Sequence, residues 1–198
     1  YRPGVIVAIR LALLRGQYDE ATGLAAKLAK TFPDTPDVSL TRARAMMAQL
    51  DLEAAEKQIN RWASDPVADS HLAKLAEGLL AFRRNDYRTA LGYLQRAHEA
   101  RPRDVEAAVY YAWAAARLGD DDGEEILRDR LSDPLWGPRA WQAFGELRYH
   151  QGRMRDAREN FANALEGYRK GIGPDWRLSE SYAWLARAWA SSRDWDHY

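Results

Sequence analysis

The 198 residues include no cysteine, carry no net charge and contain no long apolar run. Without cysteine the chain has no disulfide, no thiolate metal site and no cysteine nucleophile. Its 29 basic and 29 acidic side chains cancel, so no global field draws it to nucleic acid or to an anionic membrane, and we expect neither as a ligand. The most apolar stretch, residues 5–14, is interrupted by Arg10 and is too short to span a bilayer. We therefore expect no membrane insertion by this segment.

Catalytic patterns are also missing. There is no glycine-rich phosphate loop, no nucleophile elbow and no metal-binding histidine pair. The acidic run 120–125 lacks the alternating oxygen ligands of a calcium loop. We interpret it as a helix start, in which Asp121 or Asp122 caps a helix whose first turn holds Glu124 and Glu125. The sequence thus predicts no enzyme, no metal site and no cofactor.

A recurring turn is what the sequence does contain. A small or polar residue, then a large apolar one and, three residues later, an alanine occur in segments 16–21, 85–90 and 152–157, with a weaker copy in 51–55. The marker alanines are Ala21, Ala55, Ala90 and Ala157, separated by 34, 35 and 67 residues. The last interval is close to twice the first, so the chain repeats with one period throughout.

This period is that of the tetratricopeptide repeat, and the resemblance extends beyond the turn. The family's helix-packing positions are filled in order by Ala90, Leu94 and Ala97 with Pro102 after them, and by Trp141, Gly145, Ala157, Phe161 and Ala164. The resemblance implies an all-α fold: a right-handed superhelical solenoid of antiparallel helix pairs, with about 11 helices.

The register divides the chain into five repeats and a final helix. We expect one domain over 1–198, with repeats near 2–35, 36–70, 71–104, 105–137 and 138–175 and a last helix in 176–198. The fourth repeat has a long turn, 119–123, and only about eight residues remain before 132–134, so its second helix should be short. Because the chain begins at Tyr1 rather than Met, we expect it to be an excerpt from which an upstream segment, such as a signal peptide or a membrane anchor, has been removed.

Small side chains explain how paired helices approach closely. We expect Gly78 to face Ala90 and Gly145 to face Ala157, which leaves room for the opposite backbone. The glycine or asparagine in each turn suits a left-handed conformation at the end of the first helix.

The resemblance implies that a protein or peptide binds along a concave groove lined by the first helix of each repeat. Apolar groups alternate there with arginine, which favours an amphipathic partner with acidic residues. The alternative is that the apolar members are core. The family's carboxylate clamp for chaperone tails uses Lys and Asn where this chain has other residues, so that ligand is not supported. The candidate groove residues are Arg10, Arg44, Met47, Leu75, Leu79, Phe82, Arg83, Val109, Trp113, Arg117, Tyr149 and Arg187.

A second candidate interface is the tryptophan-rich C-terminal end, represented by Trp184, Trp189 and Trp195. We expect Tyr182 and Trp189 to pack inward and Trp184 and Trp195 to face outward, where an apolar patch marks an interface. The alternative is that a further helix of a longer protein covers them.

These observations favour a non-catalytic scaffold or adaptor within a larger bacterial assembly, of the envelope, secretion or polysaccharide-export kind that resembling arrays serve. The alternatives are a homo-oligomer formed through the aromatic end and an accessory domain of an enzyme whose catalytic part lies elsewhere. The location stays open between cytoplasm and periplasm, with a membrane tether outside this chain as a further option.

Overall fold

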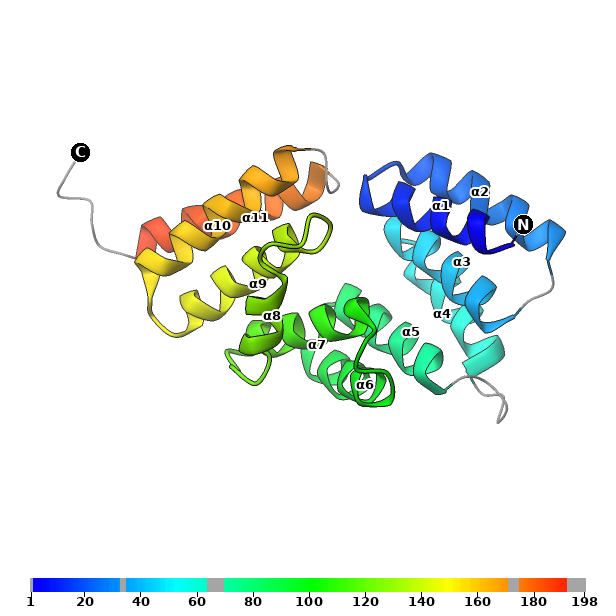
Figure 1. Ribbon diagram of the computed structural model, residues 1–198, viewed down its shortest axis with the longest axis horizontal. Helices are drawn as coiled ribbons and strands as arrows, with labels where there is room; N and C mark the ends of the chain where they lie inside the picture. The colour runs from blue at the N-terminus through cyan, green and yellow to red at the C-terminus, as the bar shows by residue number, and fades with distance from the viewer. Residues whose placement is uncertain (1, 33–34, 64–69, 171–174, 192–198) are drawn as a thin grey trace. The chain divides into compact units, whose positions relative to one another are not determined.

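The computed structural model describes residues 2–32, 35–63, 70–170 and 175–191, which form eleven helices and no strand (Figure 1). The all-α class and the number of helices are confirmed. Contacts divide the chain into two compact units, Tyr1–Ala108 (unit 1) and Val109–Tyr198 (unit 2), which are described separately. The boundary falls inside one helix, and a single domain stays a prediction. None of the described helices combines the length and apolarity that crossing a bilayer requires.

Unit 1 consists of three helix hairpins and the start of a seventh helix. The hairpins are α1 (Arg2–Leu14) with α2 (Tyr18–Thr31), α3 (Pro36–Ala48) with α4 (Leu52–Ala63), and α5 (Ser70–Arg83) with α6 (Tyr87–Ala100); α7 spans Val105–Arg117. The first helices form a row, since α1 packs on α3 and α3 packs on α5. The expected repeat starts near residues 2, 36 and 71 coincide with the starts of these helices.

Unit 2 contains the rest of α7 and four further helices: α8 (Glu124–Arg130), α9 (Gly137–His150), α10 (Met154–Arg169) and α11 (Asp175–Ser191). With 7 residues, α8 is as short as the long turn before it predicts. The longer α9 and α10 form a regular hairpin, and α11 packs against both.

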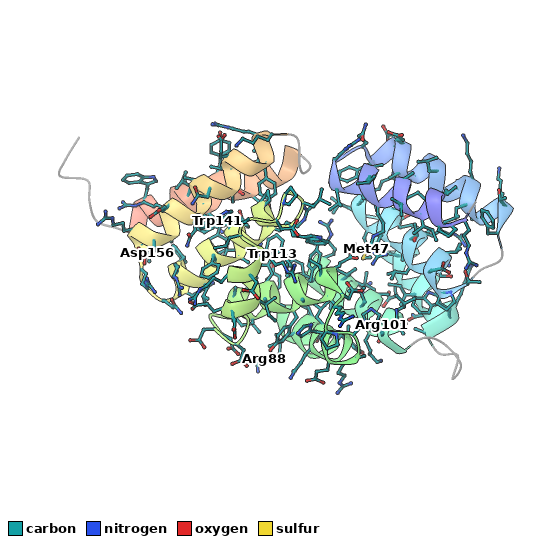
Figure 2. The ribbon with its side chains drawn as sticks, in the orientation of Figure 1. Met47, Arg88, Arg101, Trp113, Trp141 and Asp156 are labelled. Carbon is teal, nitrogen blue, oxygen red and sulfur yellow. The ribbon has the colours of Figure 1, made fainter. Side chains whose placement is uncertain are left out.

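The close approach of paired helices is confirmed at two glycines, with a change of partner. A Cβ on Gly78 would lie 2.6 Å from Leu94 Cγ, and one on Gly145 would lie 2.5 Å from the Phe161 ring. The first atoms met belong to the large residue one turn beyond the expected alanine. Space at these crossings is therefore filled by a bulky side chain inserted over a glycine. Figure 2 shows the side chains along the helices.

The turns have the expected left-handed residue. Positive φ occurs at Gly16 (75°), Asn85 (61°), Gly119 (77°) and Gly152 (75°), each just after a first helix. At the equivalent position after α3 stands Leu50, with φ 63°. A left-handed conformation costs a residue with a Cβ about 1–2 kcal/mol, so this turn is strained.

Substituting Leu50 by glycine is expected to raise the free energy of unfolding by about 0.5–1 kcal/mol, because the strain removed exceeds the extra entropy of glycine in the unfolded chain. Little packing is lost, since Leu50 is 72% exposed. Urea unfolding monitored by circular dichroism measures the change. Leu118, an exposed leucine one residue before Gly119 and without positive φ, is the matched control; Leu118→Gly should destabilise. A loss of stability in both variants would contradict the assignment of strain to Leu50.

Candidate functional site

Three charged side chains from three helices meet in unit 1. Arg44 of α3 donates to Glu106 of α7 through Nε (3.1 Å) and Nη2 (2.5 Å). Arg10 of α1 donates one longer bond, 3.3 Å, to the same carboxylate. Glu106 is 9% exposed, while the side chain of Arg10 is 46% exposed. We call these residues the Arg10–Arg44–Glu106 cluster; it presents one guanidinium to solvent and encloses the other.

The helix start that carries Glu106 is fixed by Asp104. Its Oδ1 accepts from the N–H groups of Glu106 (2.9 Å) and Ala107 (3.2 Å), which caps α7. Its Oδ2 lies 2.9 Å from Nε2 of the buried His71, whose Nδ1 lies 2.9 Å from the Ala97 carbonyl. Burial raises the pKa of Asp104, but the Ala107 N–H and His71 together hold it below its usual value. The cap is therefore charged near neutral pH and holds Glu106 in place.

Most apolar candidates for the groove are packed inside their units. Within unit 1, Met47, Leu75, Leu79 and Phe82 are buried and Arg83 is half-buried. Within unit 2, Val109 and Trp113 are completely buried, at 0% exposure. These positions favour the alternative that the apolar stripe holds neighbouring helices together. Their role in partner binding stays a prediction.

The unit 2 candidates make contacts with one another. Arg117 pairs with Glu146 and Glu180. Arg187 is exposed and its guanidinium lies 5.0 Å from the centre of the Trp184 ring. Tyr149 lies edge-on to the same ring, at 5.3 Å. The predicted residues of α7, α9 and α11 are thus brought together, but around Trp184.

The exposed and buried sides of α11 are opposite to those expected. Trp184 is buried, with its ring stacked on Phe161 at 5.9 Å. Tyr182 and Trp189 are the exposed residues, at 44% and 43%. The helix buries Ser181, Trp184 and Ala188, whose spacing of three and four defines one face, so the residues that follow Ser181 and Ala188 turn outward. Trp195 lies outside the described residues.

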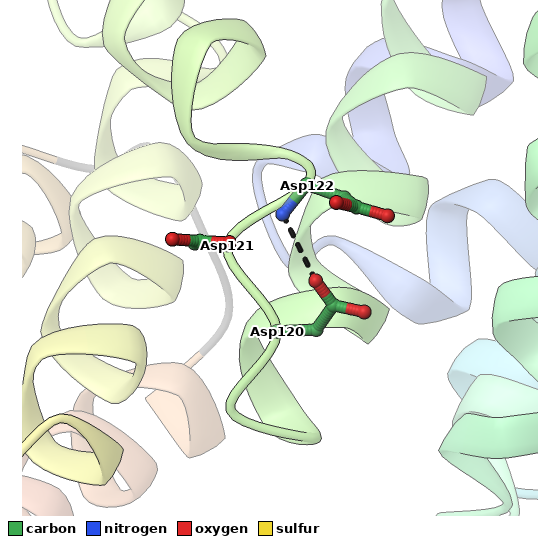
Figure 3. Close-up of side chains that lie close together, drawn as sticks. All are labelled: Asp120, Asp121 and Asp122. Carbon is green, nitrogen blue, oxygen red and sulfur yellow. Dashed lines mark hydrogen bonds between the residues drawn. The ribbon is translucent and has the colours of Figure 1, made fainter.

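The acidic turn before α8 differs from the predicted cap. Gly123 is the N-cap and no side chain caps the helix, although Glu124 and Glu125 are in the first turn as expected. Instead, the carboxylate of Asp120 accepts the N–H of Asp122 at 3.0 Å, and the turn bonds to itself (Figure 3). The carboxylates of Asp120, Asp121 and Asp122 have oxygens within 4.8 Å of one another. Exposed acidic groups of this kind are common without an ion, and we assign them no ligand.

Matches to models of known protein families show which family the chain belongs to. Models described as "Tetratricopeptide repeat" match residues 12–79 and 75–131, which together span 12–131, or 120 of the 198 residues. The chain belongs to the tetratricopeptide repeat family. That family supports protein–protein interaction in general, and its members are generally non-catalytic.

Solved tetratricopeptide structures share the fold. The chain is similar to TTC0263, a thermophilic TPR protein of Thermus thermophilus, with a TM-score of 0.64, 18% identity, and coverage of 96% of this chain and 98% of that one. It is also similar to a chain of the APC/C hetero-tetramer Cut9-Hcn1, with a TM-score of 0.59, 15% identity, and coverage of 94% of this chain and 42% of that one. A third similar structure is that of Pseudomonas aeruginosa pilF, with a TM-score of 0.54, 13% identity, and coverage of 94% of this chain and 88% of that one. At these identities the likeness shows the fold alone. No curated protein sequence matches the chain.

The acidic partners of the arginines were missed by sequence reasoning, although a signal was present. Arginines on the first helices of tetratricopeptide repeats need a counter-ion when enclosed, and the sequence suggested that a partner protein supplies it. Glu106, Glu146 and Glu180 also lie on first helices and supply it within the chain. Their common signal is a carboxylate on a first helix one or two repeats further along the chain than the arginine.

Proposed function

We propose that this chain is a non-catalytic adaptor whose first-helix surface in unit 1 binds an acidic segment of a partner protein. The observation that carries the proposal is the convergence of two guanidinium groups on the single carboxylate of Glu106. Arg10 is the accessible one and gives Glu106 one hydrogen bond of 3.3 Å. A guanidinium has five N–H donors, so Arg10 has donors left for a second carboxylate.

The charges of the cluster favour an anionic ligand. Two arginines face Glu106, and the charged Asp104, which bonds to His71 and to the N–H groups at the start of α7, also attracts Arg44. A partner carboxylate would pair with the exposed guanidinium of Arg10, and such a pair can form two parallel hydrogen bonds of defined geometry. The energy of such an exposed pair is modest, so we expect binding that weakens with salt.

Apolar side chains flank Arg10 on α1. Ile6 and Leu13, one turn before and one turn after Arg10, are partly buried and pack at the edge of the unit 1 core. Val7 is 55% exposed. A partner helix with apolar and acidic residues one turn apart would contact both Arg10 and these apolar side chains. We therefore propose an amphipathic partner.

The setting we propose is a bacterial assembly of the envelope, secretion or polysaccharide-export kind. Two of the structures that share the fold come from bacteria. Cross-linking in the source cell, followed by identification of the bound protein, tests the setting.

A peptide-display selection against the chain tests the ligand chemistry. Selected peptides are expected to be enriched in Asp and Glu, and Arg10→Gln should weaken their binding by about tenfold, equivalent to about 1.4 kcal/mol. Arg15→Gln is the matched control, because Arg15 is also an exposed arginine, just beyond the end of α1; it should bind as the wild type does. Fluorescence anisotropy with a selected peptide measures the affinities of the wild type and of both variants. Repeating it at low and high salt measures how far salt weakens binding.

Peptides without acidic enrichment, or equal binding by Arg10→Gln, would refute this function. The second candidate function is self-association, which the exposure of Tyr182 and Trp189 on α11 favours. In that case sedimentation equilibrium would show the mass rising with concentration, and the Arg10→Gln variant would associate like the wild type.

A further inference from the structure

One face of α11 is both apolar and exposed. Its aromatic residues, Tyr182 and Trp189, are 44% and 43% exposed, and three exposed alanines lie between and beside them at helical spacing. The helices α9 and α10 pack against the other side of α11, which buries Trp184. We call the exposed set the outer face of α11; it consists of Tyr182, Ala183, Ala186, Trp189 and Ala190.

The outer face of α11 corresponds to the face of α9 that α10 covers. Ala186 lies 41 residues after Gly145, and four residues before each of them stands an aromatic residue, Tyr182 or Trp141. An added Cβ on Gly145 would lie 2.5 Å from the Phe161 ring, so α10 inserts a bulky side chain over this small residue. The hairpin of α5 and α6 is built in the same way. The outer face of α11 therefore has the residue pattern on which a second helix packs.

Two arginines of α10 border the outer face. The guanidinium of Arg158 lies 4.0 Å from the centre of the Trp189 ring. That of Arg169 lies 5.7 Å from the centre of the Tyr182 ring, and it donates a hydrogen bond to the hydroxyl of this tyrosine. The two arginines are 11 residues apart, which is about three turns, so they project from the same side of α10. Each end of the outer face thus has a positive charge beside it.

These charges distinguish between two occupants of the outer face. Exposure alone favours self-association, the second candidate function. If two copies paired through this face, however, arginines would meet arginines whichever way the helices ran, and like charges disfavour such a pair. An acidic helix would instead pair with them, above all with Arg169, which is exposed and donates here to a neutral hydroxyl. The charges therefore favour a helix from a different protein.

We propose that the outer face of α11 binds one amphipathic helix of a partner protein, which completes a helix pair with α11 as α10 completes one with α9. The partner helix places a bulky apolar residue over Ala186, packs against Tyr182 and Trp189, and presents acidic residues to the arginines of α10. The site lies in unit 2. It goes beyond the function proposed for unit 1 and does not depend on Arg10.

A phage-displayed library of helical peptides, selected on the full chain, tests this site. The library keeps the residues with which α10 packs on its neighbour, Ala157, Phe161 and Ala164, and randomises the positions around them. The chain used for selection, and every variant of it, carries Arg10→Gln, so that binding at the unit 1 site is weakened. Selected peptides are expected to be enriched in Asp and Glu at the positions beside the packing residues.

Fluorescence anisotropy with a selected peptide then measures the effect of substitutions in the site. Trp189→Ala should weaken binding by at least about tenfold, because a large aromatic residue in a helix contact carries much of the binding energy. Arg169→Gln should weaken it by about threefold at low salt and by less at high salt. Lys170→Gln is the matched control, because Lys170 is also exposed and pairs with Glu166; it should bind as the parent chain does.

Should Trp189→Ala disturb folding, Ala186→Gln gives an independent result. It lengthens an exposed side chain at the place where the partner's bulky residue inserts, so it should also weaken binding by about tenfold. Peptides that bind these variants and the parent chain equally would overturn the proposal, as would a selection that yields no binding peptide or no acidic enrichment.

Sedimentation equilibrium distinguishes a second copy from a partner protein. A mass that rises with concentration in the parent chain, and stays monomeric in Trp189→Ala, would show that a second copy occupies the outer face and would overturn the proposal. A monomeric parent chain that binds acidic peptides through Trp189 supports it. Failure of the unit 1 function leaves these outcomes unchanged, since each is measured with Arg10→Gln in place.

Discussion

Replacement of Glu106 by alanine is expected to lower the free energy of unfolding by about 3 kcal/mol. The substitution leaves Arg44, whose side chain is 12% exposed, with its charge enclosed and without the carboxylate that it is hydrogen-bonded to. A buried charge that has lost its partner costs far more than the pair contributes when intact, because desolvation is no longer offset. Urea unfolding of the full chain, monitored by circular dichroism, measures the loss.

Arg10→Gln is the matched comparison, since it removes a bond to the same carboxylate from an exposed arginine. It should change the free energy of unfolding by less than about 0.5 kcal/mol. A Glu106→Ala variant that loses no more than Arg10→Gln would contradict the enclosure of Arg44. The double variant Arg44→Met with Glu106→Leu should recover most of the stability, because no charge is then left buried. A small effect of Arg10→Gln on folding also makes it a clean test of partner binding.

The repeat could be predicted because its signals are local. A positive φ favours glycine or asparagine, as at Gly16 and Asn85, at one place in the turn, and a small residue such as Gly78 fits where helices cross. Both constraints act within one hairpin and recur with each repeat. The period therefore defines the helices to within a few residues, including the short α8, whose length follows from the long turn before it.

The face that each first helix buries was harder to predict. On α11, Tyr182, Trp184 and Trp189 are all large and apolar, so the sequence alone does not say which of them turns inward. The choice depends on α10, where Phe161 offers a ring for Trp184 to stack on. An error of one residue rotates the assigned face by about 100°, which is enough to exchange the buried and the exposed aromatic residues.

The charged clusters were missed because their members are distant in sequence. Arg44 is 62 residues from Glu106, and Arg117 is 63 residues from Glu180. Both separations span two repeats, which places each arginine and its glutamate on first helices. The two units thus use the same arrangement, a long arginine that reaches a carboxylate two repeats further along the chain. A repeat analysis limited to adjacent hairpins does not detect such pairs.

Gly123→Ala is the second substitution with a large expected effect, a loss of about 2–4 kcal/mol. An added Cβ would lie 2.4 Å from both the Cα and the Cβ of Ala112 in α7, and neither atom can move away without the helix. The backbone of Gly123, at φ −95°, suits alanine, so the contact alone is responsible. Helix α8 would have to move off α7, and a helix of 7 residues is not stable without packing.

Gly92→Ala is the control for this steric argument. Gly92 lies in the exposed interior of α6 with nothing within 4 Å of an added Cβ, so alanine should stabilise the helix by about 0.5–1 kcal/mol. Urea unfolding of both variants should therefore give changes of opposite sign. A Gly123→Ala variant as stable as the wild type would show that α8 does not pack closely on α7. In that case the irregular fourth repeat would lack the contact that holds α8 against α7. The short length of α8 would then follow only from the long turn before it.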